Sequence, residues 1–143
     1  MLFNNNQIII LYILITICIL IFINGYYKCK KKNEFYNKYD ILSKNYNFTN
    51  IKSLNNYLDG WAFSHFTLFF ILTYIYPSEW KFLIIAGIIW EIIEYILSME
   101  IFNYNCNDKN GYKYRNFWYA QYEDIIMNFL GMITALTILK IIK

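Results

Sequence analysis

Four apolar blocks separated by polar stretches run along the chain. They extend from Gln7 to Asn24, from Gly60 to Tyr76, from Trp80 to Ser98 and from about Tyr122 to Ile142. A helix that crosses a bilayer needs about 20 mainly apolar residues, so the pattern predicts four membrane-spanning helices. Residues 77–79 contain the proline and form a tight turn, which makes the second and third helices antiparallel neighbours.

The first block has no basic stretch before it and no obvious cleavage site of small residues, so we interpret it as a retained membrane anchor rather than a signal peptide. The pattern predicts three regions: a transmembrane anchor in residues 1–24, a polar loop in 25–59 and a three-span core in 60–143. For residues 25–59 two interpretations remain open, a short amphipathic helix lying in the membrane interface or a solvated loop.

Positive charge is distributed unevenly between the loops. Residues 25–59 hold seven Lys and Arg and residues 99–121 hold three, against three (Lys81, Lys140 and Lys143) on the opposite side. By the positive-inside rule, loops 25–59 and 99–121 are cytoplasmic and both termini lie on the other side.

Composition supports the same class of protein. Of the 143 residues, 58% are hydrophobic and only 16% are charged, and the hydrophobic ones are gathered in blocks, which is typical of a multi-pass membrane protein rather than a soluble core. The predicted fold class is therefore all-α, an integral membrane four-helix bundle. The net charge of +3 reflects the lysine cluster, and no basic and aromatic layout typical of nucleic-acid binding is present. The expected partner is membrane lipid, with no nucleic acid.

The third block carries two carboxylates, Glu91 and Glu94. A charge at the centre of a spanning helix costs about 2.5 to 3.5 kcal/mol, whereas each Ile, Leu or Phe contributes only about 0.3 to 0.6 kcal/mol in favour of insertion. The two glutamates share one helical face, which extends to Gly87 and Ser98. A stripe of small and polar residues on an apolar helix predicts a face directed into the bundle.

Comparable stripes occur on two other predicted helices. On the fourth helix, four small or polar residues repeat at the same steps as on the third, and we expect them to let these two backbones approach closely. On the second helix, Gly60, Ser64 and Thr67 form a face with His65 beside it. The stripe of the fourth helix is Asp124, Asn128, Gly131 and Ala135.

In the predicted topology these polar residues converge at one depth near the cytoplasmic side. At about 1.5 Å per residue, His65 lies roughly 7 Å along its helix from Gly60, and Asn128 about 9 Å from Tyr122. The sequence therefore predicts one buried polar pocket. Its predicted lining is Asp59, Ser64, His65, Glu91, Glu94, Asp124 and Asn128.

Three motifs taken in order resemble the VanZ-like and related small bacterial polytopic membrane protein families. They are LDGWAFSH from Leu58, WEIIE from Trp90 and DIIMNFLG from Asp124, and together they cover residues 58–135. The resemblance implies a helical membrane bundle with a histidine at a helix start, a glutamate pair and an Asp-x-x-x-Asn-x-x-Gly helix. These families lack a settled biochemical activity, so the resemblance implies positions rather than a reaction.

The predicted site residues are His65, Glu91, Glu94, Asp124 and Asn128, and three hypotheses about them remain open. His65, Glu91, Glu94 and Asp124 could bind Zn²⁺ or another divalent metal through mixed nitrogen and oxygen ligands. The same groups could share protons, serving acid–base chemistry on a lipid head group or a proton-coupled transporter. Alternatively, the polar groups hold the helices together in a structural membrane protein. Enzyme, transporter and structural protein are thus all compatible with the sequence.

Overall fold

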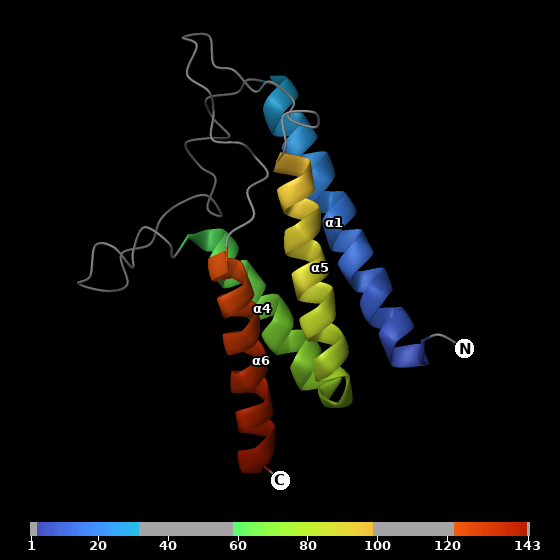
Figure 1. The fold of residues 1–143 in the computed structure, drawn as a ribbon, viewed down its shortest axis with the longest axis vertical. Helices are drawn as coiled ribbons and strands as arrows, with labels where there is room; N and C mark the ends of the chain where they lie inside the picture. The colour runs from blue at the N-terminus through green and yellow to red at the C-terminus, as the bar shows by residue number, and fades with distance from the viewer. Residues whose placement is uncertain (1–2, 32–58, 99–121, 143) are drawn as a thin grey trace, which may run out of the picture. The chain divides into compact units, whose positions relative to one another are not determined.

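The computed structural model describes residues 3–31, 59–98 and 122–142. Within these residues it contains four α-helices, one short 3-10 helix and no β-strand (Figure 1), which confirms the all-α prediction. In chain order they are α1 (Asn5–Lys31), α4 (Gly60–Ile75), η1 (Pro77–Glu79), α5 (Trp80–Ser98) and α6 (Tyr122–Ile142). The predicted interfacial helix of loop 25–59 and the whole of loop 99–121 lie outside the described residues.

The observed helix ends agree closely with the apolar blocks. The helices α5 and α6 have the predicted bounds, and α4 ends one residue earlier than expected. The first helix differs, because α1 continues past Asn24 through the first lysines to Lys31. Lysine is a good helix former and no proline interrupts this stretch, so the helix outlasts the hydrophobic block that predicted it.

Two helices are long and apolar enough to cross a membrane, judged by length and composition. They are α1 over Asn5–Asn24 and α6 over Tyr122–Ile142. The helix α4 is apolar, but its 16 residues give a length of only about 24 Å, against about 30 Å for the hydrocarbon core. The four predicted helices are therefore confirmed, and two of them are long and apolar enough to cross a membrane. The arrangement with four spans stays a prediction.

Asp59 explains where α4 begins. It is buried, has extended backbone angles, and its carboxylate accepts a hydrogen bond from the backbone N–H of Ala62 at 3.0 Å. This N-cap satisfies one of the backbone donors left free in the first helical turn. At the other end, Pro77 disfavours helical geometry at Tyr76, and the chain turns through η1 directly into α5.

The described residues belong to two compact units. One contains α1 and the end of α5 from Ile92 onward. The other contains Asp59, α4, η1, α5 as far as Glu91, and α6, and we call it the three-helix unit. It holds most of the predicted site residues.

Gly131 of α6 makes a very close contact with another helix of the three-helix unit. A Cβ atom added there would lie 2.3 Å from the backbone oxygen of Phe66 on α4. Only glycine permits this approach, so the backbones of α4 and α6 are in direct contact. The prediction that the small residues of α6 bring its backbone against the third predicted helix is wrong for Gly131, which lies against α4.

Gly87 of α5 has a different environment. A Cβ atom added there would lie 3.0 Å from the ring of Phe69 and 3.1 Å from the side-chain nitrogen of Asn128. The small residue on α5 thus accommodates side chains from the two other helices rather than a backbone. Phe69 and Met132 are themselves buried, and with Leu83 of α5 they form part of the apolar core beside this contact.

Candidate functional site

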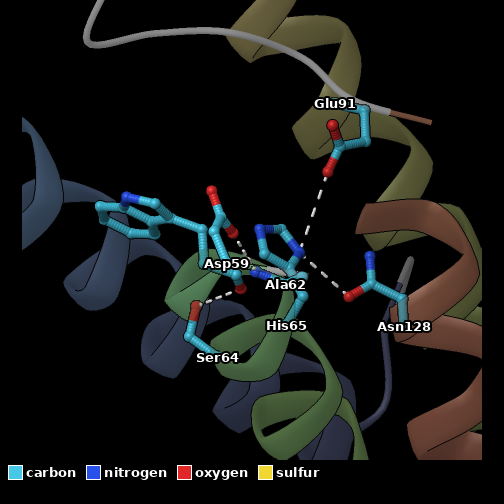
Figure 2. A network of polar contacts seen from close by, with 7 residues as sticks. Asp59, Ala62, Ser64, His65, Glu91 and Asn128 are labelled. Atoms are coloured by element: carbon cyan, nitrogen blue, oxygen red, sulfur yellow. Dashed lines mark hydrogen bonds and ion pairs between the residues drawn. The ribbon is translucent and has the colours of Figure 1, made fainter. Parts of the chain in front are cut away.

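His65 of α4 lies at the centre of a buried polar cluster formed by three helices. Its Nδ1 atom is 3.1 Å from Oδ1 of Asn128 on α6 and 3.9 Å from Oε1 of Glu91 on α5, as Figure 2 shows. The exposed fractions of His65, Asn128 and Glu91 are 8%, 3% and 5%. An imidazole, an amide and a carboxylate from three separate helices therefore meet in the interior of the three-helix unit.

The turn at η1 accounts for the pairing of His65 with Glu91. One turn further along α4, Phe69 lies against Gly87, which is one turn before Glu91 on α5. Contacts that advance along α4 while they retreat along α5 define antiparallel helices, as the short turn predicts. The i, i+4 step on both helices then brings His65 and Glu91 opposite each other.

Asp124, in the first turn of α6, completes the cluster. Ligand-type atoms of His65, Glu91 and Asp124 all lie within 4.8 Å of one another, and all three residues are buried. An acidic side chain near a helix N-terminus interacts favourably with the helix dipole. Nevertheless, Oδ1 of Asp124 has no hydrogen-bond partner among the described residues. The Nδ2 atom of Asn128 is in the same situation within that part of the chain.

The predicted stripe on α6 is confirmed as a buried face. Asp124, Asn128, Gly131 and Ala135 are all buried, together with Met132. The regular i, i+4, i+7, i+11 spacing located this face correctly because a straight helix keeps such residues on one side.

The predicted face of α4 is partly wrong. Thr67 is exposed, and Ser64 is half-buried with its hydroxyl donating a hydrogen bond to the carbonyl of Trp61 at 2.7 Å. Gly60 is buried as predicted, and the buried face continues through His65 and Phe69. Small residues suggested one side of this helix, but the larger side chains of His65 and Phe69 are the buried ones, because they contact α5 and α6.

Glu94 differs from Glu91 in its burial and in the compact unit to which it belongs. It is half-buried and belongs to the part of α5 in the other compact unit. Its inclusion among the site residues stays a prediction. The observed cluster consists of His65, Glu91, Asp124 and Asn128, with Asp59 at the start of α4 setting the beginning of the helix that carries the histidine.

Two further buried polar residues were not predicted. Thr73 is fully buried on α4, and Glu79 is buried in η1, where the Ser78 hydroxyl donates a hydrogen bond to it at 3.4 Å. Thr73 lies four residues after Phe69, so the periodicity of the His65 face contains the signal for it. Glu79 follows the proline of a turn, and no pattern distinguishes a buried acid there from a solvated one.

The charges of the cluster limit what it can do. Two carboxylates, Glu91 and Asp124, approach each other in an interior of low dielectric, where uncompensated negative charges repel strongly. Either a shared proton or a bound cation would relieve this repulsion. The imidazole of His65 could take part in both, as a proton carrier or as a metal ligand.

Comparison of the chain with protein-family models, with curated proteins and with solved structures finds no match. Functional inference therefore depends on the residues of the chain and on their geometry. The resemblance of its three motifs to the VanZ-like families stays a proposal.

Proposed function

We propose that the chain is a multi-pass integral membrane protein, related to the VanZ-like families, that binds or acts on the polar part of a lipid or another amphiphilic small molecule. The observation that carries this proposal is the buried meeting of His65 with Asn128 and Glu91. In the proposed topology the cluster lies at the cytoplasmic side, where a lipid head group could reach it.

The distribution of side chains supports a membrane environment for the three-helix unit. Its interior contains ionisable and amide groups, while isoleucines cover much of its exposed surface on α5 and α6. In water such a surface would favour association, whereas in a bilayer it contacts acyl chains. We infer that α4 and α5 also cross the membrane. The exposed isoleucines within the unit include Ile71, Ile75, Ile85, Ile88, Ile89, Ile126 and Ile133.

The chemistry of His65 suits a group that must transfer or hold a proton. Its Nδ1 atom contacts an amide oxygen at 3.1 Å, which holds the ring in one orientation, and the nearby carboxylate of Glu91 stabilises the protonated form when it occurs. A proton donor and a proton acceptor at membrane depth match the phosphate, hydroxyl or amine of a lipid head group better than they match an acyl chain.

The proposal can be tested with the full chain purified in detergent. We expect defined membrane lipids to co-purify with the protein or to be converted by it, as measured by mass spectrometry of extracted lipids. Substituting His65→Gln or Glu91→Gln should abolish this retention or conversion while helicity measured by circular dichroism is unchanged. Ser64→Ala is the matched control, because this hydroxyl is bonded within its own helix. Unchanged lipid profiles in both site variants would contradict the proposal.

A second candidate function is proton or ion transport. The 3.9 Å separation of His65 Nδ1 and Glu91 Oε1 is short enough for one water molecule or a small rotation to connect them, which favours proton relay. For this function we expect pH-dependent flux in reconstituted vesicles that Glu91→Gln eliminates. A purely structural role for the cluster would instead leave activity intact in every isosteric variant that folds.

A further inference from the structure

We propose that His65, Glu91 and Asp124 bind one divalent transition-metal ion, with Zn²⁺ as the expected occupant. Each residue comes from a different helix, all three are buried, and their ligand atoms lie within 4.8 Å of one another. The inference goes beyond the proposed lipid function and does not depend on it.

The separations are close to those of a metal centre. With bonds of about 2.0 to 2.2 Å, the ligand atoms of a tetrahedral zinc site lie roughly 3.3 to 3.6 Å apart. His65 Nδ1 and Glu91 Oε1 are 3.9 Å apart, slightly more than this range. The widest separation allowed within the group is 4.8 Å, so binding requires the carboxylates to move inward by about 1 Å, which side-chain rotation can supply.

An unsatisfied oxygen provides a second, independent observation. Asp124 is only 3% exposed, yet its Oδ1 atom has no hydrogen-bond partner among the described residues. Buried carboxylate oxygens in folded proteins are almost always partnered. A cation held between Asp124, Glu91 and His65 would use this oxygen directly.

Charge balance points the same way. Glu91 and Asp124 carry a charge of minus two when ionised, and Asp59 is a third buried carboxylate close enough to act on both Asp124 and His65. A divalent cation would offset two of these negative charges. Neutral polar clusters are far less costly than charged ones in an apolar interior. A shared proton offsets only one negative charge, whereas a divalent cation offsets two.

The ligand types select the metal. Imidazole nitrogen binds Zn²⁺ and neighbouring transition metals well, whereas Mg²⁺ and Ca²⁺ prefer sites made of oxygen ligands. Three protein ligands leave a fourth position for water, which is the arrangement of catalytic rather than structural zinc sites. Asn128 Oδ1 contacts His65 Nδ1 at 3.1 Å, and a nitrogen that binds a metal carries no proton, so coordination through Nδ1 would replace this hydrogen bond.

The test uses the full chain purified in detergent, treated with a chelator, reloaded with Zn²⁺ and separated from excess metal. We expect about one equivalent of zinc per chain by elemental analysis. Asp124→Asn and His65→Ala should each weaken zinc affinity at least about tenfold, the size of effect seen when even supporting groups of a metal site are removed. Asp124→Asn preserves side-chain shape, so circular dichroism should show unchanged helicity.

Glu123→Gln serves as the matched control, since it removes a neighbouring, half-buried carboxylate that is outside the ligand group. It should leave zinc stoichiometry and affinity unchanged. Zinc absent from the reloaded wild-type chain, or equal affinity in wild type and Asp124→Asn, would overturn the proposal, as would Mg²⁺ competing with Zn²⁺ on equal terms.

The result can be separated from that of the lipid assay. Lipid retention that depends on His65 in a chain that binds no zinc would refute the metal site and leave the proposed function standing. If the chain binds zinc but its lipid profile does not change when His65 or Glu91 is substituted, the metal site stands and the proposed lipid function is refuted.

Discussion

At the scale of single residues, Asp59 contributes to the site indirectly by starting the helix that carries His65. Its carboxylate accepts the Ala62 N–H at 3.0 Å. Replacing an N-cap acid with alanine costs about 0.5 to 2 kcal/mol, so Asp59→Ala should lower the thermal unfolding temperature in detergent, measured by circular dichroism. Asp59→Asn keeps the cap and should lose much less stability. Equal losses in both variants would show that the charge, rather than the cap, is what matters.

Substitution of Thr73 is expected to raise the stability of the protein, whereas Asp59→Ala lowers it. It is fully buried, and its hydroxyl has no hydrogen-bond partner among the described residues. A buried hydroxyl without a partner costs about 1 to 3 kcal/mol, so the isosteric change Thr73→Val should raise stability.

Thr134 is the control for this prediction, because its hydroxyl donates to the carbonyl of Leu130 at 2.7 Å. Thr134→Val should be neutral or slightly destabilising in the same unfolding measurement. A loss of stability in Thr73→Val would mean that its hydroxyl is satisfied by a group beyond the described residues.

Residue spacing predicted most members of the buried polar cluster, but it misjudged one face of α4. The four-residue step from Asp124 to Asn128 and the apolar surroundings of Glu91 predicted buried polar positions correctly. The face of α4 was misjudged at Thr67 because small residues were taken to mark the interior. Which side of an apolar helix is buried depends on the partner helices, and that information is absent from the sequence of α4 itself.

At the scale of elements, the contact between α4 and α6 depends on Gly131. Adding a methyl group at a position 2.3 Å from the Phe66 backbone oxygen must push the two helices apart. We expect Gly131→Ala to destabilise the protein by about 1 to 3 kcal/mol, the usual range for overpacking, as measured by thermal unfolding.

Gly87→Ala provides the comparison within the same unit. Its added methyl would meet the tip of the Phe69 ring at 3.0 Å, and a side chain can move aside where a backbone cannot. The loss of stability should therefore be smaller than for Gly131→Ala. The reverse order would indicate that α4 and α6 are not in direct backbone contact.

The bounds of α4 were predictable because a strong local signal stands at each end of its apolar block. Asp59 caps α4 and Pro77 stops it, so the bounds agree to one residue. The length of α1 was underestimated because hydrophobicity defined the block, whereas helix formation continues through lysines that carry no apolar signal. The length of a helix and the length of its membrane-spanning part are different properties. They agree only where the residues next to the apolar block also end the helix.

At the scale of the whole molecule, the predicted topology places loops 25–59 and 99–121 on the same side of the membrane. The chain carries its own probes, since Cys29 lies at the start of one loop and Cys106 within the other. In a Cys18→Ala background, a thiol reagent that cannot cross the membrane should label both cysteines only when the cytoplasmic face is exposed. Labelling of the two from opposite faces would exclude an arrangement with four spans.

The arrangement of the molecule is also where sequence reasoning reaches its limit. The depth argument treated Glu94 in the same way as Glu91, because both lie on one face of one helix. Glu91 and Glu94 fall in different compact units, so the place of Glu94 in the site stays a prediction. The spacing of residues predicts which side of a helix they share. It does not predict which other helix packs against each turn, because that depends on contacts between distant parts of the chain.

The short turn at η1 has a consequence for how the site is assembled during synthesis. The helices α4 and α5 are joined by Pro77–Glu79 alone, so in the proposed topology they would enter the membrane together as a helical hairpin. His65 and Glu91 can therefore meet before α6 has left the ribosome, because chains are made from the N-terminus. Asp124 and Asn128 arrive last, and until then the hairpin holds an incomplete site. The His65, Glu91, Asp124 and Asn128 cluster would thus be complete only after α6 has packed against α4.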